Sequence, residues 1–213
     1  YNIQLLLLAR NKNKLEQIFG KRREVKFIVQ DVCDRIIIPA RTDYILHAAG
    51  SASPYAIIHD PIGIIKANTM GTINVLEMAK LTTIKKVLFT STREIYGKVE
   101  NITSIKETDM GILDPLDPRS CYPESKRMAE TLLKSYSIQY NINFNSLRIA
   151  HTYGPGMQTQ NDGRVMADFM DDALNNRDIQ LNSDGTAERA FCYLTDTIEA
   201  IFRVLINGIN NEA

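Results

Sequence analysis

The run "KKVLFTST", residues 85–92, gives the first strong indication of a fold class, because an unbroken apolar core leads into hydroxyl side chains. Continuous rather than alternating hydrophobicity is typical of a strand that is covered on both faces, as in a parallel sheet packed between helices. Four further runs share this character: "IQLLLLA" (3–9), "VKFIVQ" (25–30), "DYILHAA" (43–49) and "FNSLRIA" (144–150). The sequence therefore predicts five buried strands.

Helical patterns fall between these strands, near residues 12–19, 62–81 and 120–140. This alternation predicts an α/β fold, a doubly wound parallel sheet (Rossmann-like), over residues 1–150. After residue 150 the chain becomes rich in Gly, Asn and Asp around one helical pattern, "RVMADFMDDALNN", and the late segment "FCYLTDTIEAIFRVLI". Residues 151–213 are therefore expected to form part of a smaller C-terminal lobe.

Two features concern the continuity of the chain. The link "RIIIPART" (35–42) between the second and third strands is shorter than the crossover of about a dozen residues that neighbouring parallel strands need. The chain also opens directly on a strand, with no glycine-rich turn before it. We expect that residues are missing near 35–42, and that an N-terminal strand with its glycine loop and a C-terminal tail lie outside the sequence.

Composition excludes several classes of partner. The 25 basic and 25 acidic residues cancel, so no net field draws the protein to nucleic acid or to an anionic membrane. The longest apolar run is far too short to span a bilayer. Three scattered cysteines suit a reducing compartment, with the cytoplasm as the default. The three histidines (His47, His59 and His151) lack the spacing of a metal site, and no metal is predicted.

The stretch "SCYPESKRMAE" (120–130) places Tyr122 and Lys126 four residues apart at the start of a predicted helix. Ser120 can cap that helix, and Pro123 is tolerated in its first turn. Residues four apart share a helix face, so the phenol and the ammonium can point into one site as an acid/base unit. Bringing the pKa of a tyrosine from about 10 to about 7 requires about 4 kcal/mol of preferential stabilisation of the phenolate, much of which a neighbouring cation can supply.

Four other stretches fall in a consistent order around this pair: "HAAGSASP" (47–54), "ANTMGT" (67–72), "FTSTREIYG" (89–97) and "RIAHTYGP" (148–155). Three of them follow the ends of predicted strands. Ligands of open α/β sheets bind at the carboxyl ends of the strands, so these stretches predict one shared site.

Together these motifs resemble the extended short-chain dehydrogenase/reductase family, and within it the NAD-dependent nucleotide-sugar epimerases, dehydratases and decarboxylases. The resemblance covers nearly the whole chain. It implies that Tyr122, Lys126 and Thr92 act on a sugar 4-hydroxyl beside NAD, with Tyr122 as the base, Lys126 lowering the pKa of the phenol and Thr92 donating a hydrogen bond. It also implies a nucleotide-sugar substrate held by a smaller substrate-binding lobe, residues 151–213. The cofactor-binding residues implied are Asp31, Val32, Ala48, Ala49, Gly50, Asn68, Tyr122 and Lys126.

Glu94 bears on the reaction type within this group. At this place the pattern of the 4,6-dehydratases resembles Thr-Asp-Glu, and that of the UDP-glucuronate decarboxylases resembles Ser-Thr-Ser-Glu. This chain reads Thr92-Arg93-Glu94. Arginine cannot give up a proton near neutral pH, which counts against dehydration. Glu94 is taken as a fourth catalytic residue, since alternation along a strand is expected to put it on the same face as Thr92.

Three stretches favour the decarboxylase branch: "ASP" followed by "DP" within 52–61, "NDGRV" (161–165) and "ERAFCYLTD" (188–196). Three positions depart from its pattern. Ile57 stands where those enzymes tend to carry a tyrosine, Arg93 replaces a serine, and His151 replaces the asparagine of "RIxNTxGP". The resemblance therefore leans toward UDP-glucuronate decarboxylase-like chemistry and leaves nucleotide-sugar 4-epimerase, dTDP-glucose 4,6-dehydratase-like lyase and a non-catalytic dinucleotide-binding sensor as alternatives.

The candidate substrate-binding residues are Ser53, His151, Arg164 and Arg189. The two arginines suit the diphosphate or a carboxylate, because a guanidinium pairs with such oxygens bidentately, although surface salt bridges are the simpler interpretation. NAD is the expected cofactor. Arg10 after the first strand keeps NADP open, because an arginine there can accommodate a 2′-phosphate.

The resemblance also implies a homodimer. The helix pair "TINVLEMAK" (72–80) and "SKRMAETLLKSYS" (125–137) carries apolar stripes that suit a four-helix contact between two copies. The alternative is that both stripes only cover the sheet.

Overall fold

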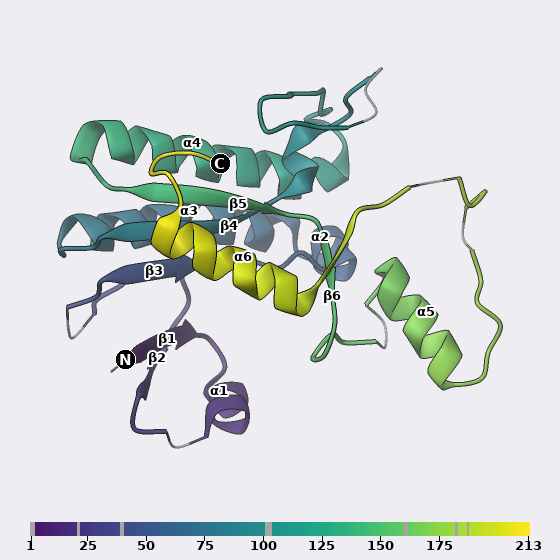
Figure 1. The fold of residues 1–213 in the computed structure, drawn as a ribbon, viewed down its shortest axis with the longest axis horizontal. Helices are drawn as coiled ribbons and strands as arrows, with labels where there is room; N and C mark the ends of the chain where they lie inside the picture. Colours follow the sequence, from purple (N-terminus) through teal and green to yellow (C-terminus); the bar gives the residue numbers. More distant parts are fainter. Residues whose placement is uncertain are drawn as a thin grey trace.

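The computed structural model describes residues 3–20, 22–38, 41–100, 104–159, 162–181, 183–186 and 188–213 and shows an α/β protein (Figure 1). The strands are β1 (Leu5–Ala9), β2 (Val25–Val29), β3 (Tyr44–His47), β4 (Lys86–Thr92), β5 (Phe144–Ile149), β6 (His151–Tyr153) and β7 (Phe191–Tyr193). The α-helices are α1 (Lys12–Phe19), α2 (Pro54–His59), α3 (Pro61–Lys80), α4 (Cys121–Tyr140), α5 (Val165–Leu174) and α6 (Leu194–Asn207), with short 3-10 turns η1 (Arg93–Tyr96) and η2 (Pro118–Ser120).

Every pairing between these strands is parallel, as predicted. The largest ladder has the order β3-β4-β5, and the pairs β1-β2 and β6-β7 form separate ladders. β4 lies at the centre, and its residues Val87, Leu88 and Phe89 are completely buried (0% exposed). The continuous apolar run in "KKVLFTST" therefore marks the strand with the most complete cover.

Helices cover both faces of this ladder (Figure 1). α3 and α4 pack side by side on one face, and α6 crosses β4 and β5 on the other. The core between α3, α4 and the sheet contains Val75, Leu76, Ala129 and Leu133 packed against Phe89. This arrangement confirms the predicted doubly wound class.

The short link between β2 and β3 has a different explanation from the one expected. β2 pairs with β1, whereas β3 pairs with β4, so the two strands are not neighbours in a ladder of the described residues. No crossover between adjacent parallel strands is needed there. The reason for expecting missing residues near 35–42 is therefore wrong, and residues 39 and 40 of that link lie outside the described part.

Side-chain caps begin α1 and α3, whereas α2, α4, α5 and α6 have none among the described residues. The Asp60 carboxylate accepts from the Gly63 backbone N at 3.0 Å before α3, with Pro61 in the first turn. At α4 the expected cap is wrong, because the Ser120 hydroxyl donates to the Asp114 carbonyl at 2.6 Å and makes no cap bond. The short helix α2 and the separate strand β6 were not predicted.

The part after β5 contains β6, β7, α5 and α6. β6 and β7 pair in register, with His151 opposite Phe191, and α5 stands away from the sheet layers (Figure 1). The division into domains at residue 150 stays a prediction. No helix in the described ranges has the length and apolar character needed to cross a membrane.

Candidate functional site

Tyr122 and Lys126 lie one turn apart on the inner face of α4, and each side chain is 5% exposed. Thr92, 7% exposed, ends β4 beside them. Burial raises the pKa of Tyr122 above its ordinary value; the nearby Thr92 hydroxyl opposes this rise, and the Glu94 carboxylate adds to it. The predicted trio therefore meets in one buried place.

The Lys126 ammonium does not contact the phenol directly in this structure, so its effect on the pKa of Tyr122 stays a prediction. Its Nζ lies 6.0 Å from the centre of the Tyr122 ring and 4.4 Å from that of Phe89. The ammonium donates to the Thr90 carbonyl at 2.8 Å. Burial lowers the pKa of Lys126 to about 8, an effect that Glu130 opposes. Burial thus makes the Lys126 cation less stable than that of a lysine in water.

Gly50 and Asn68 border this ammonium. Asn68 is 0% exposed, and its Nδ2 donates to the Ser125 hydroxyl at 2.9 Å. Its Oδ1 is buried without a hydrogen-bond partner among the described residues. Gly50 has a φ of +130°, and a Cβ there would lie 2.7 Å from this Oδ1 and 4.0 Å from the Lys126 Nζ. Glycine is therefore required, and the orphaned oxygen fits a bound ligand that carries hydroxyl donors.

His47 lies beneath the site at the end of β3, 3% exposed. Its Nε2 is 3.0 Å from the Thr72 hydroxyl, which donates its own hydrogen to the Asn68 carbonyl at 2.5 Å. His47 is therefore the donor and carries its proton on Nε2. Burial, with a smaller effect of Lys126, lowers the pKa of His47 to about 3, so the ring is neutral. After it, Ala49 packs against the main core and Ala48 is exposed.

The expectation that Glu94 alternates with Thr92 along a strand is wrong. β4 ends at Thr92, and Glu94 lies in the turn η1. The Thr92 hydroxyl accepts from the Glu94 backbone N at 3.2 Å, which caps the turn. The Glu94 carboxylate forms an ion pair with Arg119 at 3.1 Å. The turn, and not strand alternation, places Glu94 near Thr92 and Tyr122.

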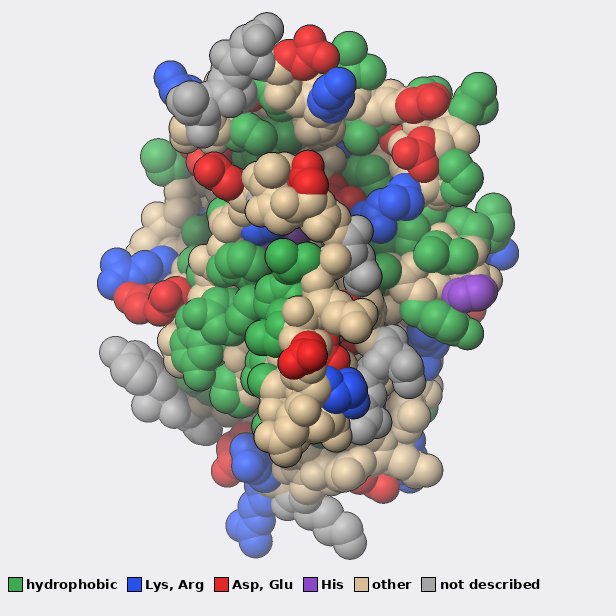
Figure 2. Space-filling view, turned by 90° about the vertical axis from the view of Figure 1, so that its right-hand side faces the viewer, with side chains coloured by type: hydrophobic (Ala, Val, Ile, Leu, Met, Phe, Trp, Pro, Cys, Tyr) green, Lys and Arg blue, Asp and Glu red, His purple; other side chains and the backbone are tan. Residues whose placement is uncertain are grey.

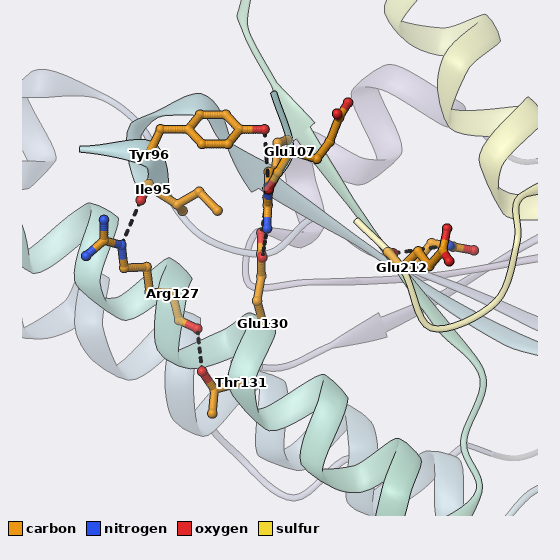
Figure 3. A network of polar contacts seen from close by, with 9 residues as sticks. Ile95, Tyr96, Glu107, Arg127, Glu130, Thr131 and Glu212 are labelled. Carbon is orange, nitrogen blue, oxygen red and sulfur yellow. Dashed lines mark hydrogen bonds and ion pairs between the residues drawn. The ribbon is translucent and has the colours of Figure 1, made fainter. Parts of the chain in front are cut away.

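A polar network fixes this turn from below (Figure 3). The Arg127 Nε donates to the Ile95 carbonyl at 2.7 Å. Arg148 binds both carboxylate oxygens of Glu130, at 2.8 and 3.2 Å, and donates to the Glu107 carbonyl at 2.6 Å. The network ties α4 and β5 to the segments around Ile95 and Glu107. Sequence reasoning missed it, and no spacing in the sequence pairs these residues.

The candidate cofactor residues after β2 are engaged locally. Asp31 accepts from the Cys33 backbone N at 2.9 Å and lies 3.5 Å from an Arg10 nitrogen. These contacts, the first above all, lower the pKa of Asp31. Val32 is buried, and a Cβ on Gly71 of α3 would approach its side chain to 2.8 Å. A small residue in α3 thus allows the close packing that holds this loop.

The candidate substrate residues fall into two groups. His151 accepts from Arg93 at 3.0 Å, and Arg189 is close enough to both residues to lower their pKa values. Arg164 instead forms a bidentate ion pair with Asp162, the simpler interpretation considered above. Within the described ranges no hydrogen bond or ion pair joins Arg164 to Arg189 or His151.

Ser53 precedes α2, and Gly163 approaches α2 closely, since a Cβ there would lie 3.6 Å from Pro54. Beside them is a cavity of about 710 Å³ between α2 and α5. It is lined by Pro54, Tyr55, Ile58, Thr159, Gly163 and Arg177 with the aspartates 162, 168, 171 and 172. Figure 2 shows this side of the molecule, with hydrophobic side chains in patches and charged ones scattered among them. Arg177 pairs with two of the aspartates, and the described residues contain no cluster suited to a metal ion.

Comparison with known proteins is consistent across sequence and structure. The profile of the NAD dependent epimerase/dehydratase family matches residues 3–213. UDP-glucuronic acid decarboxylase 5 of Arabidopsis thaliana is 37% identical over 195 residues, which cover 92% of this chain and 55% of the relative. UDP-glucuronic acid decarboxylase 1 of Xenopus tropicalis is 34% identical over 200 residues, covering 94% and 46%. The chain thus spans about half the length of these curated relatives.

Solved structures share the fold. The UDP-glucose 4-epimerase of Thermotoga maritima, solved with UDP-glucose, has a TM-score of 0.82 at 24% identity and covers 98% of this chain and 75% of that one. The dTDP-glucose 4,6-dehydratase of Streptomyces venezuelae, solved with NAD, has a TM-score of 0.83 at 22% identity, covering 100% and 65%.

Proposed function

The chain belongs to the NAD-dependent epimerase/dehydratase family, and on this premise we propose that it modifies a nucleotide sugar through a 4-keto intermediate, with decarboxylation of UDP-glucuronate as the leading reaction. One observation carries the proposal: Thr92, Tyr122 and Lys126 meet in a buried cluster at the carboxyl end of β4. That is where ligands of open α/β sheets bind.

NAD is the proposed cofactor, and this chain's residues offer it a fitting environment. The orphaned Asn68 Oδ1 and the Lys126 ammonium border Gly50, where a backbone without a side chain allows close approach. Asp31 and Val32 are proposed to contact it after β2, as are Ala48 and Ala49 after β3. When bound, NAD would supply the acceptor for a hydride from the sugar. Because Arg10 already lies against Asp31, we place NAD before NADP.

The protein side of the reaction is proton handling at the sugar 4-oxygen. In the proposed reaction Thr92 donates a hydrogen bond to this oxygen and Tyr122 removes its proton as hydride leaves the carbon. Burial and the Glu94 carboxylate both favour the neutral phenol, so a cation must favour the phenolate. Lys126, buried one turn away, is the candidate for that cation.

Decarboxylation follows from the 4-keto group. Loss of CO₂ breaks the C5–C6 bond, and its electron pair moves through C5 to the 4-oxygen, which the Thr92 donor stabilises as an enolate. A proton then returns to C5. Return of the hydride to C4 and of a proton from Tyr122 to the 4-oxygen would complete the cycle, so that the net change is the loss of CO₂ alone. Arg93 stands where an acid would be needed for 4,6-dehydration and cannot supply its proton.

A second candidate is 4-epimerisation, favoured by the ion pair of Glu94 with Arg119 at 3.1 Å. A carboxylate that is held in this ion pair can have a purely structural role. If Glu94 has only that role, it takes no part in a second step at C5 or C6. The reaction then needs only oxidation and reduction at C4.

Product analysis by mass spectrometry tests the proposal and separates the candidates. The purified protein is incubated with NAD and a panel of UDP, dTDP, GDP and CDP sugars. Loss of one CO₂ from UDP-glucuronate identifies the decarboxylase, loss of one water identifies a dehydratase, and an unchanged mass with a new retention time identifies an epimerase. Binding without any change in every sugar would identify a non-catalytic sensor.

A homodimer is proposed as the assembly. The outer sides of α3 and α4 expose Ile62, Met70, Ile73 and Met128, with exposed fractions between 37% and 60%. Apolar side chains on two adjacent helices suit a four-helix contact with a second copy. Sedimentation should give twice the monomer mass. The three free cysteines are consistent with the proposed cytoplasmic location.

A further inference from the structure

Two residues that depart from the family pattern, Arg93 and His151, contact each other. The Arg93 Nη2 lies 3.0 Å from the His151 Nε2. A guanidinium can only donate, so Nε2 is the acceptor and His151 is neutral with its proton on Nδ1. That nitrogen lies 3.3 Å from the Ala190 carbonyl, which also accepts from the His151 backbone N at 3.3 Å.

The His151 ring is therefore fixed and serves as an anchor for Arg93. It lies 5.5 Å from the Phe191 ring, between β6 and the start of β7. In the part of the chain that the structure describes, His151 is the hydrogen-bonding partner of the Arg93 side chain, and the remaining N–H groups of the guanidinium have no protein acceptor. Because a guanidinium has five N–H donors, most of them are available to a ligand.

The charges around Arg93 do not balance. Burial lowers the pKa of Arg93, and so do the nearby guanidinium groups of Arg189 and Arg119, against the opposing effect of Glu94. Arg93 thus has two other guanidinium groups and one carboxylate near it, and Arg119 already pairs with that carboxylate at 3.1 Å. An excess of positive charge with free donors is an environment for an anion.

The position of Arg93 indicates which anion of the substrate lies there. Thr92, the residue before it, is proposed to bind the sugar 4-oxygen. On a hexose ring C5, which carries the C6 group, is bonded to C4, whereas C1 and its diphosphate lie across the ring. We propose that Arg93, oriented by His151, binds a C6 carboxylate and selects a uronic acid sugar nucleotide over its neutral counterpart. This inference rests on the proposed function.

Calorimetric titration with two matched probes tests it. UDP-glucuronate and UDP-glucose differ only in the C6 group, and each is titrated into the purified protein with NADH present, so that the sugar is not oxidised during the titration. The wild-type protein should bind UDP-glucuronate more tightly. Arg93→Gln should weaken UDP-glucuronate binding by about 10- to 100-fold, the usual effect of losing a hydrogen bond to a charged group, and change UDP-glucose binding by less than about 3-fold.

Two variants complete the design. His151→Phe removes the acceptor and keeps a ring, so it should lower the preference for UDP-glucuronate in part, which a merely structural role would not do. Arg203→Gln, on the exposed side of α6, is the matched control and should keep the wild-type preference. Thermal unfolding of each variant confirms that it is folded.

The outcomes distinguish a failure of the Arg93 inference from a failure of the proposed function. Equal weakening of both probes by Arg93→Gln would assign Arg93 to the diphosphate and overturn the inference. Unchanged UDP-glucuronate binding would overturn it too, while product formation by the wild-type protein would leave the proposed function standing. If neither nucleotide sugar binds the wild-type protein, the proposed function itself fails, and the inference with it.

Discussion

Replacing Glu130 with glutamine should strongly destabilise the protein, because it breaks the buried ion pair with Arg148 (Figure 3). The Glu130 and Arg148 side chains are 15% and 9% exposed, and the pair makes two hydrogen bonds. Removing one partner of a buried pair costs about 3–5 kcal/mol, since the other charge stays behind without compensation. Glutamine keeps one acceptor oxygen, so we expect a loss of about 3 kcal/mol. For a domain of this size that corresponds to a fall of about 6–12 °C in the melting temperature.

Urea unfolding followed by circular dichroism measures this loss, with Glu199→Gln as the matched control. Glu199 pairs with Arg203 on α6, where the side chains are 60% and 74% exposed, so its replacement should change stability by less than about 0.5 kcal/mol. A loss below about 1 kcal/mol in Glu130→Gln, with an unchanged urea dependence, would refute the assignment of this network as the support of the turn η1. Turnover should fall as well, because the turn carries Glu94.

Three further predictions concern the site. Tyr122→Phe should lower turnover by about 100-fold or more while leaving the melting temperature nearly unchanged, since the ring still packs but accepts no proton; near-normal steady-state turnover would exclude Tyr122 as the base. Glu94→Gln should allow oxidation at C4 but stop the second step, so that reduced cofactor accumulates in a stopped-flow absorbance trace; normal product formation would make Glu94 structural and favour epimerisation. The pKa of His47 is about 3 in the folded protein and near 6.5 in the unfolded protein. The stability due to its neutral form is therefore present above about pH 6.5 and is lost as the pH falls toward 3. The free energy of unfolding should fall by up to about 1.4 kcal/mol per pH unit in this range. Urea unfolding between pH 7 and about pH 4 should show this slope, and His47→Gln should flatten it.

The sequence was sufficient for the strands β1 to β5, the long helices α3 and α4, and the trio around Tyr122. Unbroken apolar runs and helical spacing are local signals, and the carboxyl ends of parallel strands meet wherever such a sheet forms. For the same reason Thr92 and Gly50 could be placed near the Tyr122 and Lys126 pair from the sequence alone.

Contacts that depend on packing between distant segments could not be predicted. Glu94 was expected to continue the strand, but β4 ends at Thr92 because the Thr92 side chain caps the following turn. The partner of Glu94 is Arg119, 25 residues along the chain, and His151 contacts Arg93 across 58 residues. Side-chain pairing at such separations follows from the relative placement of η1, η2 and β6, which no local pattern encodes.

A single-turnover experiment tests the central claim most directly. The NAD-loaded protein is mixed with UDP-glucuronate in a stopped-flow instrument, and the absorbance of reduced nicotinamide is followed together with release of CO₂. The account predicts a transient rise in this absorbance that precedes CO₂ release and is absent in Tyr122→Phe. Formation of product with no reduction of the cofactor at any time would contradict it.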